Sequence, residues 1–120
     1  MLEHDVLVIG AGLAGMRAAI AARASGANTA IISKVHPVRS HSNAAQGGIN
    51  AALTDRGDDW QEHAYETVKG SDFLGDQDAI ELMCRAAGKA LIDLEHMGVT
   101  FNRDDEGRLG TRRFGGQQRA

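Results

Sequence analysis

The sequence predicts an α/β fold that opens with a strand–helix–strand unit of a parallel sheet, and three observations carry this prediction. Residues 5–10 and 28–33 are two short apolar runs rich in β-branched residues, as buried strands are. The segment between them places small and apolar residues at helical spacing. Gly26 follows that segment as a helix stop. A strand, a helix and a strand within about 30 residues form the usual βαβ unit.

The next elements are expected to be a loop and two helices. Residues 34–46 read as a long loop, because Pro37 and a run of Ser, His and Asn disfavour regular structure. A short helix is expected to open near Gln46. A further helix is expected over 59–69, with Asp58 or Asp59 as its N-cap and Gly70 after its end.

The last part of the chain is expected to form a long helix and a hairpin. A tight loop over 71–76 leads to Asp76, which caps a helix that continues to about Met97 and stops at Gly98. Six residues at helical spacing predict its apolar face: Ile80, Met83, Cys84, Ala87, Leu91 and Leu94. Alternation on either side of 104–107 indicates a hairpin.

Composition and charge narrow the classes of function. The chain has 120 residues, 42% hydrophobic and 24% charged, which is typical of one small globular domain. The net charge is −3 and no basic stripe is visible, so no nucleic-acid partner is expected. With Cys84 as the only cysteine, an internal disulfide is impossible and a reducing compartment fits. Neither a secretory signal nor an apolar run long enough for a membrane span is visible.

The stretch GAGLAG, residues 10–15, matches the G-x-G-x-x-G pattern between a strand and a helix. Gly10 permits the tight turn, Gly12 lets the backbone approach a pyrophosphate, and Gly15 lets the helix pack on the strand. The N–H groups of the helix N-terminus are then available to a phosphate. The alternative is a glycine-rich turn that binds no ligand. The pattern therefore predicts a Rossmann-like dinucleotide site.

The end of the second strand departs from the NAD fingerprint. An acidic residue for the ribose is expected about 20 residues after the glycines, but Ser33 and Lys34 stand there instead. Ser33 can form one hydrogen bond, whereas Lys34 cannot accept any. An NADP site is possible in principle, with Lys34 as its only support.

Four separated stretches give the sequence a family resemblance. GAGLAG, SKVHPVRSHSNAAQGGINAAL, VKGSDFLGDQDAI and RRFGGQ together resemble the flavoprotein subunits of succinate dehydrogenase and fumarate reductase over essentially all 120 residues. The resemblance implies a Rossmann-like FAD-binding βαβ unit with following helices, a partial FAD-binding domain. It implies FAD as the cofactor and these cofactor-binding residues: Gly10, Ala11, Gly12, Leu13, Ala14, Gly15, Ser33, Lys34, Ser40, His41, Ser42, Ala45, Gln46, Gly47 and Gly48.

The resemblance also gives His41 a role. The family joins the 8α-methyl carbon of the flavin covalently to a histidine, and His41 occupies that position. A neutral imidazole nitrogen is a competent nucleophile near pH 7, and the alkylated ring would withdraw electrons and raise the flavin potential. Small residues, Ala44, Ala45, Gly47 and Gly48, would let the backbone approach the ring. Asn43 departs from the apolar residue that the family commonly has there. Without the motif, His41 would read as a solvated loop histidine.

The resemblance further implies where the substrate binds and which parts of the enzyme lie elsewhere. Gly47 and Phe114 match contacts to the dicarboxylate substrate, whereas Phe114 without its motif would read as core packing. The family's catalytic arginine and most dicarboxylate ligands follow the segment seen here, so no catalytic residue is expected in it. Residues 1–120 are accordingly expected to be the N-terminal part of an FAD-binding domain, without the capping and C-terminal helical domains.

The implied partners are an iron–sulfur subunit and one or more membrane anchor subunits. They would hold the protein peripherally at the cytoplasmic side of the cell membrane. Two alternatives remain open: an L-aspartate oxidase-like flavoenzyme, against which His41 argues, and a non-catalytic FAD-binding fragment.

The remaining polar residues are expected to be structural. His4, His36, His63 and His96 lack metal-ligand spacing and read as surface or satisfied histidines, so no metal site is expected. Cys84 is expected in the core of the long helix. Asp55, Asp58 and Asp59 read as a solvated turn and a helix cap.

Overall fold

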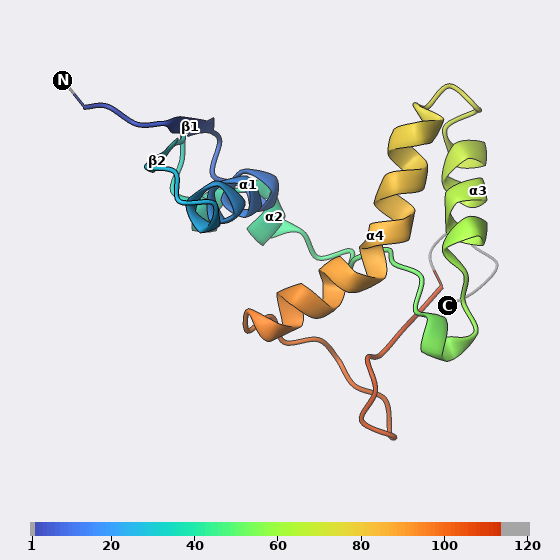
Figure 1. The fold of residues 1–120 in the computed structure, drawn as a ribbon. Coiled ribbons are helices and arrows are strands. Elements are labelled where there is room, and N and C mark those ends of the chain that lie inside the picture. Colours follow the sequence, from blue (N-terminus) through green and yellow to red (C-terminus); the bar gives the residue numbers. More distant parts are fainter. Residues whose placement is uncertain (1, 114–120) are drawn as a thin grey trace. The chain divides into compact units, whose positions relative to one another are not determined.

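The computed structural model describes residues 2–113. They fall into two compact units, which are divided between Gly48 and Ile49. The first unit contains β1 (Val6–Ile9), α1 (Leu13–Ala24) and β2 (Thr29–Ile32), followed by the 3₁₀ turn η1 (Pro37–Arg39) and the short helix α2 (His41–Ala44). The second contains η2 (Thr54–Arg56), α3 (Trp60–Gly70) and α4 (Gln77–His96). Figure 1 shows these elements along the chain.

The first unit is the predicted βαβ unit. β1 and β2 pair in parallel with Val6 opposite Thr29 and Ile9 opposite Ile32, and α1 is the crossover between them. The backbone N–H of Asp5 donates to the Asn28 carbonyl (2.9 Å) just before the strands, and that of Gly10 donates to the Ile32 carbonyl (2.7 Å) just after them. The register is therefore fixed at both ends, and both carboxyl ends lie at the same edge.

Gly15 allows α1 to approach the end of β1 very closely. A Cβ atom at Gly15 would lie 1.9 Å from the carbonyl oxygen of Gly10 and 3.4 Å from a methyl group of Val8. Only a hydrogen fits in that space. The sequence-based role of Gly15 in packing the helix on the strand follows directly from this contact.

The segment after β2 contains more helical structure than expected before Ala44 and less after it. The predicted loop over 34–46 contains two short helical turns, η1 and α2. The helix predicted to open near Gln46 is wrong, because no helix lies between Ala44 and Thr54. Ala45 already has extended dihedral angles (φ −66°, ψ 131°), and Gly48 takes a positive φ of 95°. Adjacent glycines also disfavour a helix, since each loses more backbone freedom than alanine would.

The two helices of the second unit begin at the predicted caps. The Asp59 carboxylate accepts from the Gln61 N–H at 2.8 Å, and the Asp76 carboxylate accepts from the Ala79 N–H at 3.1 Å. These bonds satisfy two of the N–H groups that a helix N-terminus leaves unpaired. Asp58, the other residue predicted as a possible cap of α3, accepts a hydrogen bond from the Asp59 N–H. Gly70 is the last residue of α3 rather than the first after it.

α3 and α4 lie side by side as a helical hairpin (Figure 1). Cys84 on α4 is 1% exposed and Leu91 is also buried, as predicted for the apolar face. Met83, which is predicted on the same face, is 52% exposed. It lies at the edge of the apolar face, 60° around the helix from Ile80 by ideal geometry of about 100° per residue.

His63 on α3 is a second correction. The sequence predicts a surface or satisfied histidine here, but His63 is 6% exposed and its Nδ1 has no hydrogen-bond partner. Its position on the inner face of an amphipathic helix, three residues after Trp60, explains the burial.

The chain after α4 forms the predicted hairpin-like turn, with one antiparallel bridge between Arg103 and Leu109. Asp104 organises it. Partial burial raises the pKa of Asp104. Hydrogen bonds from the backbone N–H groups of Arg108 and Glu106, together with the charge of Arg108, outweigh this effect, so the pKa of Asp104 lies below its ordinary value. Arg56 reaches the same carboxylate at 3.1 Å and donates to the Leu109 carbonyl. Through residues 2–113, no helix is both long and apolar enough to cross a membrane.

Candidate functional site

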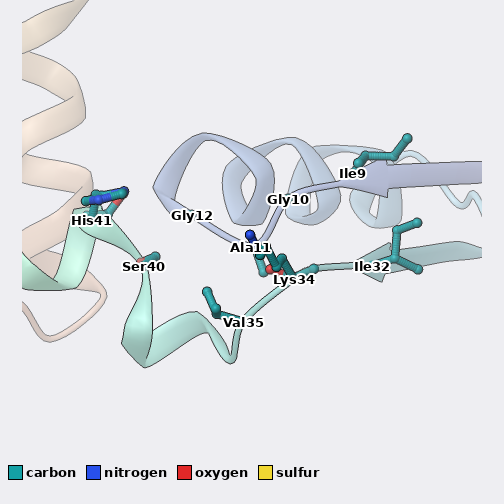
Figure 2. Close-up of a pocket in the computed structure, with 11 residues that line it drawn as sticks. Ile9, Gly10, Ala11, Gly12, Ile32, Lys34, Val35, Ser40 and His41 are labelled. Atoms are coloured by element: carbon teal, nitrogen blue, oxygen red, sulfur yellow. The ribbon is translucent and has the colours of Figure 1, made fainter.

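A cleft of about 540 Å³ lies at the carboxyl ends of β1 and β2. Three segments form it: the end of β1 with the glycine turn, the end of β2, and the loop that carries α2. The lining residues are Ile9, Gly10, Ala11, Gly12, Ile32, Ser33, Lys34, Val35, Ser40, His41 and Ser42. Figure 2 shows the two strands entering from one side and the Ser40–His41 segment on the other. Ligands of open α/β sheets bind at this edge.

The glycine turn forms the floor of the cleft. Gly10 has a φ of 106°, which a residue with a side chain rarely adopts. Gly12 precedes α1, and a Cβ atom there would lie 3.4 Å from the Ser42 hydroxyl. The backbone at Gly12 is therefore open to the cleft, because a Cβ there would meet only this one atom within 4 Å. A phosphate could approach the backbone here, as the pattern predicts.

The N-terminus of α1 supplies hydrogen-bond donors to this floor. The backbone N–H of Leu13, the first helical residue, donates to the Ser42 hydroxyl at 3.1 Å. Helix geometry leaves the next N–H groups, those of Ala14 and Gly15, without acceptors inside the helix. These two groups and the partial positive charge of the helix end are suited to an anion.

The end of β2 supplies Ser33 and Lys34. Both side chains line the cleft, and the 11 lining residues include no carboxylate. The ribose-binding acid of an NAD site is therefore absent from this part of the cleft. The arrangement leaves one hydroxyl and one ammonium group to contact a nucleotide.

Ser40 and His41 face the glycine turn from the opposite side of the cleft (Figure 2). The Ser40 hydroxyl is buried and has no hydrogen-bond partner in the protein. A buried hydroxyl of this kind is costly unless a ligand or water satisfies it. His41 is exposed at the start of α2. The cleft thus presents an unpaired hydroxyl and an accessible imidazole to whatever occupies it.

The structure brings together only part of the predicted site. Eight of the predicted cofactor-binding residues line the cleft: Gly10, Ala11, Gly12, Ser33, Lys34, Ser40, His41 and Ser42. Leu13, Ala14 and Gly15 lie next to it in α1. Ala45, Gln46, Gly47 and Gly48 do not line it. Phe114, the predicted substrate contact, lies outside the described residues.

Three apolar lining residues were missed: Ile9, Ile32 and Val35. Ile9 and Ile32 are opposite each other as the last residues of their strands, and both are more than half exposed. The rule that ligands bind at the carboxyl ends of parallel strands could have found them. Within residues 2–113, no three His, Cys, Asp or Glu side chains are grouped as metal ligands would be.

The donor set of the cleft fits FAD. A dinucleotide carries a pyrophosphate, for which the glycine turn and the α1 N-terminus are suited. It also carries hydroxyl and ring acceptors, for which Ser33, Lys34 and the unpaired Ser40 hydroxyl are available. The exposed apolar ends of β1 and β2 offer a surface for the flat parts of such a ligand.

Comparison with known proteins agrees with this chemistry. A family model described as an FAD binding domain matches residues 5–120. The succinate dehydrogenase flavoprotein subunit of Rickettsia bellii is 60% identical over 115 residues, which cover 95% of this chain and 19% of that protein. The chain therefore spans about a fifth of the length of this relative.

Solved structures give the same result. The Mycobacterium smegmatis Sdh1 complex in the apo form matches with a TM-score of 0.90 and 38% identity over 96% of this chain and 20% of that chain. A variant of E. coli quinol fumarate reductase matches with a TM-score of 0.89 and 40% identity, over 98% of this chain and 20% of that chain. None of these three relatives supports an L-aspartate oxidase. With the family model matching nearly all of its length, the chain belongs to the family of FAD-binding domains.

Proposed function

We propose that this chain is the N-terminal part of the FAD-binding domain of a succinate dehydrogenase or fumarate reductase flavoprotein subunit. The observation that carries the proposal is the meeting of the glycine turn and the His41 segment in one cleft, in a chain 60% identical to such a subunit over 115 residues. The enzyme would interconvert succinate and fumarate and pass electrons to an iron–sulfur subunit.

Residues on each side of the cleft would bind a different part of the cofactor. Gly12 lets the pyrophosphate approach, and the N–H groups of Ala14 and Gly15 bind it. Ser33 and Lys34 contact the nucleotide from the end of β2, and the Ser40 hydroxyl gains the partner that it lacks in the protein. Bound FAD supplies two-electron exchange with the dicarboxylate.

The remaining cofactor contacts come from the four residues after α2. Ala45, Gln46, Gly47 and Gly48 would follow the flavin beyond the cleft, with Gly47 also contacting the dicarboxylate. Small side chains here let the backbone approach a ring, and its N–H groups would stabilise negative charge on the reduced flavin. Phe114 would be the second substrate contact. Residues elsewhere in the full-length protein would handle the proton.

His41 would hold the flavin covalently. The linkage replaces one imidazole N–H bond and one C–H bond of the 8α-methyl group by a carbon–nitrogen bond. Two protons and two electrons leave, so an acceptor such as dioxygen or fumarate must take the electrons. His41 is suited to this role because it lines the cleft and is exposed to a ligand there.

The test is a denaturing gel of the full-length protein viewed for flavin fluorescence. Wild type should give a fluorescent band. His41→Ser should bind FAD in the native state but lose it on denaturation, since the phosphate contacts remain. His36→Ser is the matched control, because His36 lies in the same loop but does not line the cleft. A non-fluorescent wild-type band at full native FAD occupancy would refute the covalent link.

Activity tests the function separately. The full-length protein, assembled with its partners, should oxidise succinate with an artificial electron acceptor and should not oxidise L-aspartate. In His41→Ser the flavin potential should fall, because the electron-withdrawing link is lost, and about 30 mV corresponds to a tenfold change in a two-electron equilibrium constant. Fumarate reduction should then survive better than succinate oxidation. Activity towards L-aspartate alone would overturn the proposal.

Partners and location follow from the same proposal. An iron–sulfur subunit and membrane anchor subunits would hold the protein peripherally at the cytoplasmic face of the cell membrane, in an assembly that uses a quinone. The full-length subunit without its partners should not bind protein-free lipid vesicles in a flotation assay. Tight binding to those vesicles would contradict attachment through partners.

A further inference from the structure

We infer that Ser42 is a positioning residue for His41: its hydroxyl fixes the histidine-bearing turn α2 against the glycine turn. The inference rests on the proposed covalent attachment of FAD. It assigns Ser42 a role towards the protein, rather than the direct contact with the cofactor that the family resemblance implies.

The central observation is the hydrogen bond from the Leu13 N–H to the Ser42 hydroxyl, at 3.1 Å between residues 29 positions apart. Leu13 is the first residue of α1, and Ser42 is the second residue of α2. The bond therefore ties the histidine-bearing turn to the turn predicted to hold the pyrophosphate. The Ser42 hydroxyl is also the heavy atom nearest to the position of a Cβ at Gly12, at 3.4 Å.

His41 depends on its neighbours for its position. Among residues 2–113, its ring has no hydrogen-bond partner, and the residue is exposed. α2 is a helix of only four residues, too short to be stable without outside contacts. The orientation of the imidazole must therefore be set by whatever anchors the α2 backbone.

Two side-chain hydrogen bonds provide that anchoring, and they come from the two residues after His41. Ser42 binds the glycine turn, and the Asn43 amide donates to the Val38 carbonyl at 2.9 Å. The Asn43 bond is internal to the loop and holds α2 to η1. The Ser42 bond instead connects the loop to the opposite wall of the cleft, so Ser42 helps to set the distance between His41 and a ligand held at the glycine turn.

This distance matters for a bond-forming step more than for binding. Reacting atoms must be held about 3–3.5 Å apart in an aligned pose, and a misplacement of about 1 Å can slow a reaction by up to about 100-fold. Binding of FAD at the glycine turn needs only the phosphate contacts. Loss of the Ser42 hydroxyl should therefore slow attachment of the flavin while leaving most of its affinity.

The experiment compares Ser42→Ala, Ser42→Thr and Ser25→Ala in the full-length protein. Ser25 is the matched control, because its hydroxyl donates to the Ala22 carbonyl (2.7 Å) at the other end of the same helix. Each apoprotein is mixed with FAD, and the fluorescent band on a denaturing gel is followed in time. Ser42→Ala should attach flavin about three- to tenfold more slowly, as expected for one lost hydrogen bond. Ser42→Thr should restore most of the rate, and Ser25→Ala should match wild type.

The dissociation constant of FAD before attachment gives the second readout. It should change by less than about threefold in Ser42→Ala, since the phosphate contacts stay. A rate equal to wild type in Ser42→Ala would overturn the inference. Equal slowing in Ser42→Ala and Ser25→Ala would also overturn it, because the effect would then be general destabilisation of α1.

Amide hydrogen exchange separates failure of this inference from failure of the proposed linkage. The Leu13 amide should exchange faster in Ser42→Ala than in wild type and Ser25→Ala, whether or not a covalent bond forms. A wild-type protein without covalent flavin refutes the linkage, and with it the role of Ser42 in attachment. Unchanged exchange at Leu13 refutes the anchoring itself, whatever the state of the flavin.

Discussion

Gly15→Ala is the substitution by which the packing of α1 on the sheet is best tested. The added methyl group would lie 1.9 Å from the Gly10 carbonyl oxygen and 3.0 Å from the carbonyl carbon of the same residue. Both atoms belong to the backbone, so no side-chain rotation can relieve the clash. The start of α1 would have to move away from the glycine turn by about 1.5 Å to reach an ordinary contact distance.

The expected cost follows from two opposing terms. Overpacking of this kind costs about 1–3 kcal/mol, and a backbone clash belongs at the upper end of that range. Alanine in place of glycine in a helix recovers up to about 1 kcal/mol. The free energy of unfolding should therefore fall by about 2 kcal/mol, a factor of about 30 in the folding equilibrium. The N–H groups of Ala14 and Gly15 would move with the helix, so FAD should bind at least about tenfold more weakly.

Urea unfolding and FAD titration of the full-length protein measure the two effects. Gly70→Ala is the control, because Gly70 also belongs to a helix but a Cβ atom there has no neighbour within 4 Å. That variant should be unchanged or up to about 1 kcal/mol more stable. If Gly15→Ala behaved like Gly70→Ala in both assays, the close approach of α1 to Gly10 would not exist as described.

Three further predictions concern single contacts. Gly12→Val should abolish FAD binding with little change in the thermal midpoint of unfolding. The valine methyl groups would fill the space for the phosphate, and its Cβ would lie 3.4 Å from the Ser42 hydroxyl. A wild-type affinity for FAD in a calorimetric titration of this variant would contradict the prediction. Arg56→Leu should lower the free energy of unfolding, measured by urea unfolding, by about 1–3 kcal/mol, because the Asp104 carboxylate and the Leu109 carbonyl lose this donor. The comparison is Arg85→Leu, which removes an exposed ion pair. An equal loss of stability in both variants would refute a special role of Arg56 in holding the turn. The lowered pKa of Asp104 means that its share of stability is complete above about pH 3.9, the ordinary carboxyl value, and is lost as the pH falls through the lower folded-state value. Asp104→Asn should remove this dependence from the Arg108 amide exchange rate, whereas Asp105→Asn should keep it.

The sequence predicted best those elements whose signals are local. The βαβ unit, the Asp59 and Asp76 caps and the buried Cys84 follow from periodicity and from capping chemistry. The helix expected near Gln46 does not form, because the two adjacent glycines that follow disfavour a helix and Gly48 adopts a positive φ of 95°. Local patterns rank propensities, but they do not reveal which backbone conformation the tertiary structure requires.

The burial of side chains and their hydrogen-bond partners are harder to predict from the sequence, because both depend on contacts between residues that are distant along the chain. Met83 and Cys84 are adjacent on an amphipathic helix, yet one is 52% exposed and the other 1%. The sequence gives His63 as an ordinary polar residue of a helix, whereas in the structure it is buried and its Nδ1 has no hydrogen-bond partner. In the site, the G-x-G-x-x-G pattern predicted the glycines and the family resemblance predicted His41, whereas Ile9, Ile32 and Val35 are found only where the strand ends meet.

The polar stretch from Arg39 to Ile49 is unusual because it is too polar for a core strand and too small for an ordinary surface helix. Four of its polar side chains form two pairs. Ser42 and Asn43 are used by the protein, since they bind the Leu13 amide and the Val38 carbonyl. Ser40 and His41 line the cleft without partners among residues 2–113.

The boundary between these two pairs, at His41 and Ser42, has a structural reason. On a single helical turn, adjacent side chains point about 100° apart, so His41 and Ser42 can make different contacts. One short turn can thus be anchored to the glycine turn by one side chain while it presents the preceding side chain to the cleft. A longer helix or a strand would spread these contacts over more residues. The small residues after the turn allow the chain to leave it at once in an extended conformation, and this explains why the segment is both polar and small.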